Sequence, residues 1–333
     1  DPGKTPSENI QFLVFLMAVI KAVDEYADLL RISVASAGND HRLGANEAPP
    51  AVVSIFLGDE LTEVLKSIEN DTYFTSHGAV QMDIGATVLP HFVKDNTDRN
   101  RTSPFAFTGN KFEFRMLGSA ASVANPNIVL NTAVAEALDQ FAKELDGVAP
   151  EDMEHAVHEL IKRAIKKHKR VIFNGNGYTD EWIEEAEKRG LYNLKSTPDA
   201  LPMWIAQKNI DLFTKHSIFT SEELHSRYEI WLENYSKTIN IESNTMVEMV
   251  QKDLLPSVMS YIEEIASTAS LKASVVPGIT CESETALITK LSGLQDAMTK
   301  GLEKLKADTA KAKATDDVLE NCISLKYSRT WRN

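Results

Sequence analysis

The chain has 333 residues, of which 43% are hydrophobic and 25% are charged, a balance typical of globular proteins rather than of disordered or fibrous chains. Its formal net charge of −13 argues against broad binding to nucleic acid or to an anionic membrane, although a local basic pocket could still bind an anion. The two cysteines, Cys281 and Cys322, have neither metal-ligand spacing nor a disulfide framework, so we expect a reducing compartment, by default the cytoplasm.

The longest apolar run, residues 12–20, ends at Lys21 and is too short to cross a bilayer, so no membrane partner is expected. It lies in a predicted helix that begins after Ser7 or Asn9, either of which can cap it, and that runs to about Leu30. Because this helix is apolar almost all round, it needs cover on several sides. The chain begins without a methionine, and we expect it to be a piece of a longer protein.

Most of the chemistry in the sequence falls between residues 38 and 115. Residues 31–36 alternate apolar and polar side chains, which predicts a strand, and 37–50 form a polar loop with two glycines. A second apolar strand is expected over 51–57 and an amphipathic helix over 59–68. Polar loops often carry binding residues, so the loop over 37–50 is a candidate for function.

A charged strand is predicted over Lys111, Phe112, Glu113, Phe114 and Arg115. Side chains of a strand alternate faces, so the two rings point into a core while the three charges line the opposite face. A lone acid between two cations suits a site that holds a metal through the carboxylate and a phosphate or carboxylate through the cations. A solvated ladder of salt bridges has the same spacing and is the commoner arrangement, so both interpretations stay open on spacing alone.

Helices are predicted over 126–141 and 151–167, followed by a short strand over 171–178 that runs into a glycine turn. The turn lacks the lysine and hydroxyl residue of a phosphate-binding loop. We therefore interpret it as the entry to a helix capped by Thr179.

The eight histidines do not form a metal set by their spacing. His155 and His158 are three apart on a predicted helix, but third and fourth ligands are not evident, so we expect the pair to be exposed. The sequence also contains no zinc-protease motif and no nucleophile elbow.

The composition changes near residue 203, beyond which there is no glycine until Gly278, so we predict two domains, 1–202 and 203–333. The second carries an aromatic stripe and a heptad-like seam, which predict an all-helical domain without its own catalytic centre. The stripe comprises Leu224, Tyr228, Trp231, Leu232 and Tyr235, and the seam comprises Leu287, Leu291, Leu294, Met298, Leu302 and Leu305.

Three segments occur in an order that is more specific than any of them alone. They are Arg42-Leu43-Gly44-Ala45-Asn46-Glu47-Ala48-Pro49, Asn100-Arg101-Thr102-Ser103 and Lys111-Phe112-Glu113-Phe114-Arg115. Together they resemble the second half of the catalytic domain of glutamine synthetases, in particular the large type III branch. That family has an arginine before a Gly-x-x-Glu-Ala-Pro flap, then an Asn-Arg-Ser stretch and an Arg-x-Glu-x-Arg strand.

The resemblance implies an α+β fold, in which a mainly antiparallel sheet of an incomplete glutamine synthetase-like catalytic domain is followed by an all-helical domain. It implies ATP-dependent ligation of ammonium to glutamate through a γ-glutamyl phosphate, in a homo-oligomer of stacked rings, by implication a dodecamer. The family's β-grasp domain and upstream metal ligands precede the matched region, so this chain alone is expected to be inactive.

By the resemblance, Glu47 is the flap glutamate that closes the site and takes a proton from ammonium. Arg42 binds the carboxylate of glutamate, and Arg101 holds the γ-glutamyl phosphate. The spacing from Arg42 to Glu47 is one residue shorter than in the common family pattern, so His41 competes for the role of Arg42.

The resemblance also implies the cofactors, ATP and Mg²⁺ or Mn²⁺. Glu113 is the implied metal ligand, while Lys111 and Arg115 hold the nucleotide phosphates and the transferred phosphoryl group. Charge neutralisation of this kind is what phosphoryl transfer requires. A second family arginine is replaced here by Ala106, so one phosphate contact is missing or is supplied elsewhere.

Three alternatives remain open at the level of sequence. A sister ligase could join glutamate to another amine, and a guanidino-kinase-like phosphotransferase could use the same kind of sheet. In the third alternative the chain is a noncatalytic assembly or regulatory module, in which the helical seam matters and the charged strand is only structural.

Overall fold

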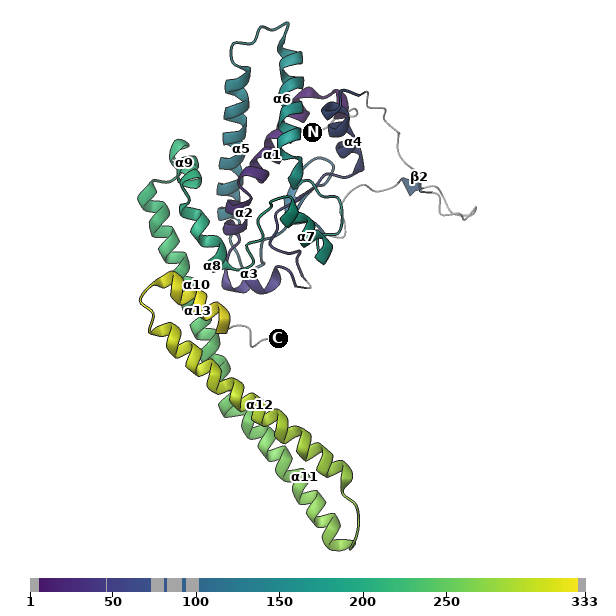
Figure 1. Cartoon of the computed structure of the whole chain (residues 1–333), viewed down its shortest axis with the longest axis vertical. Helices are drawn as coiled ribbons and strands as arrows, with labels where there is room; N and C mark the ends of the chain where they lie inside the picture. Colours follow the sequence, from purple (N-terminus) through teal and green to yellow (C-terminus); the bar gives the residue numbers. More distant parts are fainter. Residues whose placement is uncertain (1–5, 46, 73–80, 83–91, 94–101, 329–333) are drawn as a thin grey trace. The chain divides into compact units, whose positions relative to one another are not determined.

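The computed structural model describes residues 6–45, 47–72, 81–82, 92–93 and 102–328. It divides into two compact units, Asp1–Tyr228 and Glu229–Asn333. Both are mainly helical (Figure 1). The structure thus combines helices with a small sheet, and the expected mainly antiparallel sheet is not confirmed.

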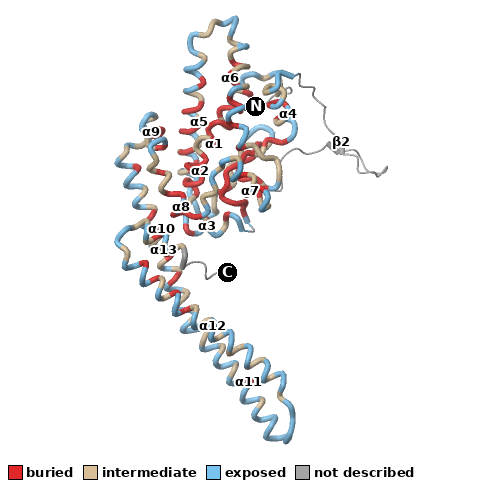
Figure 2. The backbone as a smooth tube through the Cα atoms, viewed as in Figure 1, coloured by how far each residue is buried: buried red, intermediate tan, exposed pale blue. Residues whose placement is uncertain are grey.

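The first unit is built around α1 (Ile10–Glu25), which packs against α5 (Ala124–Leu145) and α6 (Met153–His168). Asn9 is its N-cap, and the side chain of Asn9 accepts a hydrogen bond from the backbone N–H of Phe12 at 3.0 Å. The expected cover on several sides is confirmed, since the buried residues of the unit gather along α1 (Figure 2).

The strand predicted over 31–36 is wrong, and so is the first part of the loop predicted to follow it. The chain forms α2 (Ala27–Ser33) and then α3 (Ala37–Arg42), whose N-cap is Ser36. Every residue of α2 is buried, including its polar residues, so the helix has no solvent-exposed face to give the usual division into a polar and an apolar side. The alternation over 31–36 is therefore a coincidence of composition.

The sheet has three short strands, β1 (Ile55–Phe56), β4 (Phe105–Phe107) and β5 (Phe112–Phe114). β4 is central, parallel to β1 and antiparallel to β5. A separate antiparallel pair joins β2 (Gln81–Met82) and β3 (Phe92–Val93). The strand predicted over 51–57 is therefore reduced to two residues, although the apolar residues before it are buried.

The other elements of this unit are short. They are η1 (Pro6–Glu8), α4 (Asp59–Glu69), η2 (Lys169–Val171), α7 (Asp180–Lys188), α8 (Thr197–Ala200), η3 (Leu201–Ile205) and α9 (Gln207–Lys215). The predicted cap of α7 is confirmed, because Thr179 Oγ1 accepts from the N–H of Trp182 at 3.3 Å. Trp182 stacks on Phe173 at 3.7 Å between ring centroids and fixes α7 beside the glycine turn.

Helix α10 (Ser221–Met249) leads into the second unit, which continues with α11 (Leu255–Val275), α12 (Glu282–Lys313) and α13 (Val318–Ser328). A π-helical turn over Val250–Leu254 precedes Pro256, which lacks the N–H that a regular helix would use there.

Helices α11 and α12 run side by side as a hairpin (Figure 1), which confirms a helical partner for the predicted seam. Burial within the seam is confined to its end, at Leu302 and Leu305, while Leu294 is exposed. The domain boundary at 202/203 stays a prediction. Among the described helices, none is both long and apolar enough to cross a membrane.

Candidate active site

Strand β5 carries the predicted alternation. Phe112 and Phe114 lie against Phe105 of β4, with ring centroids 5.2 and 5.9 Å from it, and Phe107 contacts Phe112 at 5.2 Å. Both rings of β5 are half-buried rather than fully buried, because β5 is the edge strand of the sheet. The aromatic face anchors the strand, and the opposite face carries the charges.

Glu113 is held between two cations on that opposite face. Its carboxylate accepts from Arg115 Nη2 at 3.1 Å and Nε at 3.3 Å, and pairs with Lys111 Nζ at 3.5 Å. The hydrogen bonds from Arg115 hold the pKa of Glu113 below its ordinary value. Arg115 is largely buried while Lys111 is mostly exposed, so Arg115 is the more rigid partner. Glu113 is thus an ionised carboxylate at neutral pH and still reaches solvent.

Ala106 lies directly opposite Glu113 in the register of β4 and β5. Opposite residues of an antiparallel pair share a face, so the position where the family has a second arginine borders the carboxylate of Glu113. Ala106 is completely buried. The departure from the family pattern at 106 therefore lies within the charged cluster itself.

Arg42 at the end of α3 connects the flap loop to the end of β5. Its Nη1 donates to the carbonyl of Met116 at 3.0 Å and its Nη2 to the carbonyl of Arg115 at 3.4 Å. Its Nε lies 3.8 Å from the carboxylate of Glu47. The structure thus brings Arg42, Glu47 and Arg115 together, and it uses two nitrogens of Arg42 to hold the backbone of the charged strand.

Asn39 reinforces the same connection. Its buried amide donates to the carbonyls of Val34 at 2.8 Å and Met116 at 3.0 Å, and its Oδ1 accepts from Arg42 at 3.2 Å. The amide group has little room, since a Cβ added at Gly118 would lie 3.3 Å from Asn39 Oδ1. The hydrogen bonds of one side chain fix α3, Arg42 and Met116, two residues after β5, together.

Asp40 is a structural residue. Its carboxylate accepts from Arg31 Nη2 at 2.9 Å and from the backbone N–H and hydroxyl of Thr197 at 2.7 and 2.9 Å. Arg31 and Asp40 both have buried side chains, so Asp40 fixes α3 to α2 through the ion pair and to the start of α8 through Thr197. His41, the next residue of α3, is exposed.

The flap loop is closed at its base and exposed at its tip. The N–H of Gly44 donates to the carbonyls of Ala48 and Pro49, both at 3.1 Å, and Gly44 has a φ of +77°, which favours glycine. Glu47 projects from this loop with 78% of its side chain exposed. Asn46 lies outside the described residues.

The glycine turn is bonded to Thr102 and lies beside Pro49 at the base of the flap, an arrangement that the sequence did not reveal. The N–H of Gly177 donates to the carbonyl of Thr102 at 3.0 Å, and a Cβ at Gly177 would collide with that oxygen and approach Pro49. Asn174 in the same turn accepts from the N–H groups of Leu57 and Gly58. The Asn-Gly-Asn-Gly run of this turn was the sequence signal that could have pointed to these contacts. Arg101, next to Thr102, lies outside the described residues.

The donor set at Glu113 fits a hard cation that keeps water and phosphate ligands, because Mg²⁺ is commonly bound through one or two carboxylates. Within the described ranges, Glu113 belongs to no group of three His, Cys, Asp or Glu residues whose ligand atoms lie within 4.8 Å of one another. Asp71, His158 and Glu159 form such a group. Lys162 already bonds Asp71 there, and His158 is half-exposed. The expected exposure of His155 is confirmed.

Known proteins resemble the chain along nearly all of it. The family model for the glutamine synthetase C-terminal domain matches residues 156–272. A glutamine synthetase of Butyrivibrio fibrisolvens is 52% identical over 325 residues, which is 96% of this chain and 45% of that protein. A type-3 glutamine synthetase of Dictyostelium discoideum is 49% identical over 84% of this chain and 38% of its own length.

The chain belongs to the glutamine synthetase family. A glutamine synthetase of Bacteroides fragilis strain YCH46 is a further relative, 40% identical over 78% of this chain and 36% of its own length. The resemblance to the type III branch, inferred from three short segments, is confirmed. The chain spans less than half the length of these glutamine synthetases.

Proposed function

We propose that this chain supplies the carboxy-terminal part of a glutamine synthetase site, which ligates ammonium to L-glutamate and converts ATP to ADP and phosphate through a γ-glutamyl phosphate. The observation that carries the proposal is the carboxylate of Glu113 held between Lys111 and Arg115, beside a flap whose Glu47 is linked through Arg42 to the same strand. The relatives are more than twice as long, so the remaining metal and substrate ligands would come from the part of such a protein that this chain does not cover.

The proposed roles follow from charge and position. When bound, Mg²⁺ or Mn²⁺ would supply positive charge for the phosphates of ATP, and Glu113 would be the residue of this chain that holds it. Lys111 and Arg115 both pair with Glu113 and are proposed to stabilise the transferred phosphoryl group, with Arg101 as a further phosphate ligand. These side chains would not need to form covalent bonds to the substrate, because phosphoryl transfer depends mainly on positioning and charge stabilisation.

Glu47 is proposed to accept the proton of ammonium as the amine attacks the γ-glutamyl phosphate. Its exposed carboxylate at the tip of a loop suits a residue that covers a bound intermediate and keeps water from it. Arg42 is proposed to bind the carboxylate of glutamate. The hydrogen bonds from Arg42 to the carbonyls of Arg115 and Met116 would hold its guanidinium in place for that role.

The proposal is tested in a protein of the relatives' length that carries this sequence. Glu113→Gln keeps the size and polarity of the side chain but removes the charge that a divalent cation needs. We expect glutamate- and ammonium-dependent phosphate release to fall by about a hundredfold or more, with the apparent affinity for Mg²⁺ reduced. The matched control is Glu187→Gln, which changes an exposed carboxylate on α7 and should leave turnover unchanged.

Wild-type turnover in Glu113→Gln would contradict the proposal. If the reaction proceeds with other amines as well as with ammonium, the sister-ligase alternative replaces the narrower assignment. Phosphorylation of a guanidino compound would instead favour the kinase-like alternative. We propose that the 333-residue chain is inactive by itself. We also propose that the complete protein is cytoplasmic and forms a homo-oligomer of stacked rings.

A further inference from the structure

The guanidinium of Arg42 donates hydrogen bonds through three of its five N–H groups. Nη1 donates to the carbonyl of Met116 at 3.0 Å and to Oδ1 of Asn39 at 3.2 Å. Nη2 donates to the carbonyl of Arg115 at 3.4 Å. These bonds use both N–H groups of Nη1 and one of the two on Nη2. The N–H groups that remain are that of Nε and the second one of Nη2.

Among the residues that the structure describes, none closes this remaining edge of Arg42 with a hydrogen bond. The carboxylate of Glu47 lies 3.8 Å from Nε, which is beyond hydrogen-bond distance. The side chain of Arg42 is 23% exposed, so solvent reaches it. Nε and Nη2 are neighbours on a planar group, and their N–H groups match the two oxygens of a carboxylate. Arg42 is therefore fixed on one side and open on the other.

Asn39 controls the fixed side of Arg42 from a buried position. Its Nδ2 donates to the carbonyls of Val34 at 2.8 Å and Met116 at 3.0 Å, so the amide cannot rotate without breaking both bonds. With Nδ2 held in this way, Oδ1 is left as the acceptor for Nη1 of Arg42. The carbonyl of Met116 accepts from both side chains and so links them. A buried, doubly bonded amide thus sets the orientation of the guanidinium.

Gly118 leaves the space that the amide of Asn39 needs. A Cβ at Gly118 would lie 3.3 Å from Oδ1 of Asn39 and 3.7 Å from its Cγ. The three atoms nearest to such a Cβ all belong to Asn39. An alanine at 118 would therefore press first on the amide that holds Arg42, without removing any of its polar atoms.

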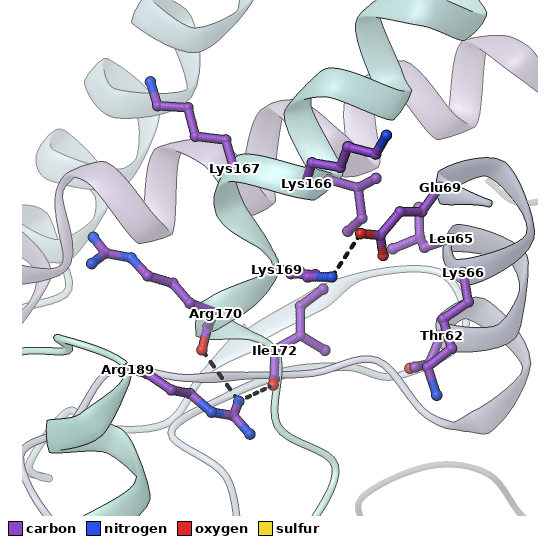
Figure 3. Close-up of a pocket in the computed structure, with 11 residues that line it drawn as sticks. Thr62, Leu65, Lys66, Glu69, Lys166, Lys167, Lys169, Arg170, Ile172 and Arg189 are labelled. Carbon is purple, nitrogen blue, oxygen red and sulfur yellow. Dashed lines mark hydrogen bonds and ion pairs between the residues drawn. The ribbon is translucent and has the colours of Figure 1, made fainter.

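An arginine that bonds to backbone carbonyls can be purely structural, and Arg189 provides the comparison. Its Nη1 donates to the carbonyls of Arg170 and Ile172 at 3.3 and 3.0 Å, the two dashed contacts of Arg189 in Figure 3. Its Nε also donates, to the carboxylate of Glu185 in α7 at 2.8 Å. The Nε of Arg189 is thus occupied within the fold, whereas Arg42 keeps the edge that includes Nε for a ligand.

We propose that Asn39 is a positioning residue of the glutamate site. It holds Nη1 of Arg42 so that the edge formed by Nε and Nη2 receives a carboxylate of L-glutamate through two hydrogen bonds. The inference rests on the glutamate-binding role proposed for Arg42, and it adds which edge binds and which residue orients that edge. Because the guanidinium is fixed before glutamate arrives, less conformational entropy is lost on binding.

Steady-state kinetics of the complete protein with Asn39→Ser tests the proposal, because serine removes the amide and keeps a small polar side chain. An interaction lost equally from the ground state and the transition state raises KM and spares kcat. We expect the KM for glutamate to rise about tenfold, with kcat and the KM for ATP changed by less than about twofold. A merely structural role would loosen the end of β5 and raise the KM for ATP as well.

Gly118→Ala keeps the amide of Asn39 but displaces it, and it should raise the KM for glutamate about threefold. It is the deciding variant if Asn39→Ser does not fold. The matched control is Asn209→Ser, because Asn209 is also a buried asparagine, whose amide donates to Asp28 at 3.0 Å and to the carbonyl of Met203 at 2.7 Å. Thermal unfolding should show lower stability for Asn209→Ser, while its KM for glutamate stays that of the parent.

Arg42→Lys separates a failure of this inference from a failure of the proposed function. Lysine cannot offer a carboxylate two N–H groups in a fixed fork, so the KM for glutamate should rise about a hundredfold. An unchanged KM in Arg42→Lys would remove Arg42 from the glutamate site and overturn both proposals. If Arg42→Lys raises the KM but Gly118→Ala and folded Asn39→Ser do not, or if they raise the KM for ATP equally, the positioning role of Asn39 is overturned and the role of Arg42 stands.

Discussion

The charge state of Glu113 depends on one neighbour more than on its exposure. Arg115 donates two hydrogen bonds to the carboxylate, and these bonds favour the ionised form, so the pKa of Glu113 is lowered. A carboxylate with a lowered pKa stays ionised as the pH falls, until the pH passes through that lowered value. A cation ligand held in this way keeps its charge in mildly acidic solution.

We therefore predict that Arg115→Gln raises the pH at which Glu113 titrates toward the ordinary range of glutamate. Lys111→Gln should raise it less, because Lys111 is more exposed and lies farther away, at 3.5 Å. The measurement is the pH dependence of the Glu113 carboxyl resonance in metal-free protein. Identical titration in the parent and Arg115→Gln would show that the contact does not control the charge.

The two cysteines should differ sharply in reactivity. Burial raises the pKa of the Cys322 thiol to about 12, and its S–H donates to the carbonyl of Leu232 at 3.2 Å. At pH 8 its thiolate fraction is on the order of one in ten thousand, so alkylation should be slow. Cys281 is half-exposed and should react first with iodoacetamide, as peptide mass spectrometry can show. Equal labelling of both thiols in folded protein would contradict the buried position of Cys322.

At the scale of elements, the flap is supported by a turn that has no room for a side chain. Gly177→Ala should destabilise the first unit by about 1–3 kcal/mol, because the added Cβ meets the backbone oxygen of Thr102, which cannot rotate away. Gly38→Ala is the control, since it lies inside α3 with nothing within 4 Å of the added Cβ. It should be neutral or stabilising by about 0.5–1 kcal/mol. Denaturant unfolding measures both, and equal effects would show that the contact with Thr102 is unimportant.

Elements with a one-sided pattern could be predicted from the sequence, and elements buried on all sides could not. Helix α4 and the Thr179 cap of α7 have clear local signals, and the faces of β5 follow from alternation alone. The end of helix α2 was missed because its Arg31 is buried and pairs with Asp40, whereas the sequence pattern treated an arginine as a surface residue. Local pattern cannot reveal a partner that lies nine positions away in another helix.

The same limit applies to the candidate site. The charged strand and the flap could be located from motifs, but the contacts that bring them together could not. Arg42 reaches the carbonyls of Arg115 and Met116 across more than seventy positions of sequence, and these acceptors are backbone atoms that no motif specifies. The Gly177 contact with Thr102 is hidden for the same reason.

At the scale of the whole molecule, the residues of the candidate site and the pattern that indicates helix packing lie in different parts of the chain. The charged strand and flap lie in the first unit, and the second is a helical unit whose α11 and α12 pack along one seam. The helical character of residues after 203 was predictable from apolar periodicity and caps. The relatives are glutamine synthetases more than twice as long, and we propose that residues outside this chain complete the site.

The most direct test of the proposed ligase site is the ratio of phosphate released to glutamine formed at saturating ammonium, in the complete protein and its Glu47→Ala variant. If Glu47 takes the proton of ammonium and the flap excludes water, glutamine formation should fall roughly a hundredfold, while the γ-glutamyl phosphate that still forms is lost to hydrolysis. The parent should release one phosphate per glutamine, and the variant several. An unchanged ratio with unchanged turnover would contradict the account.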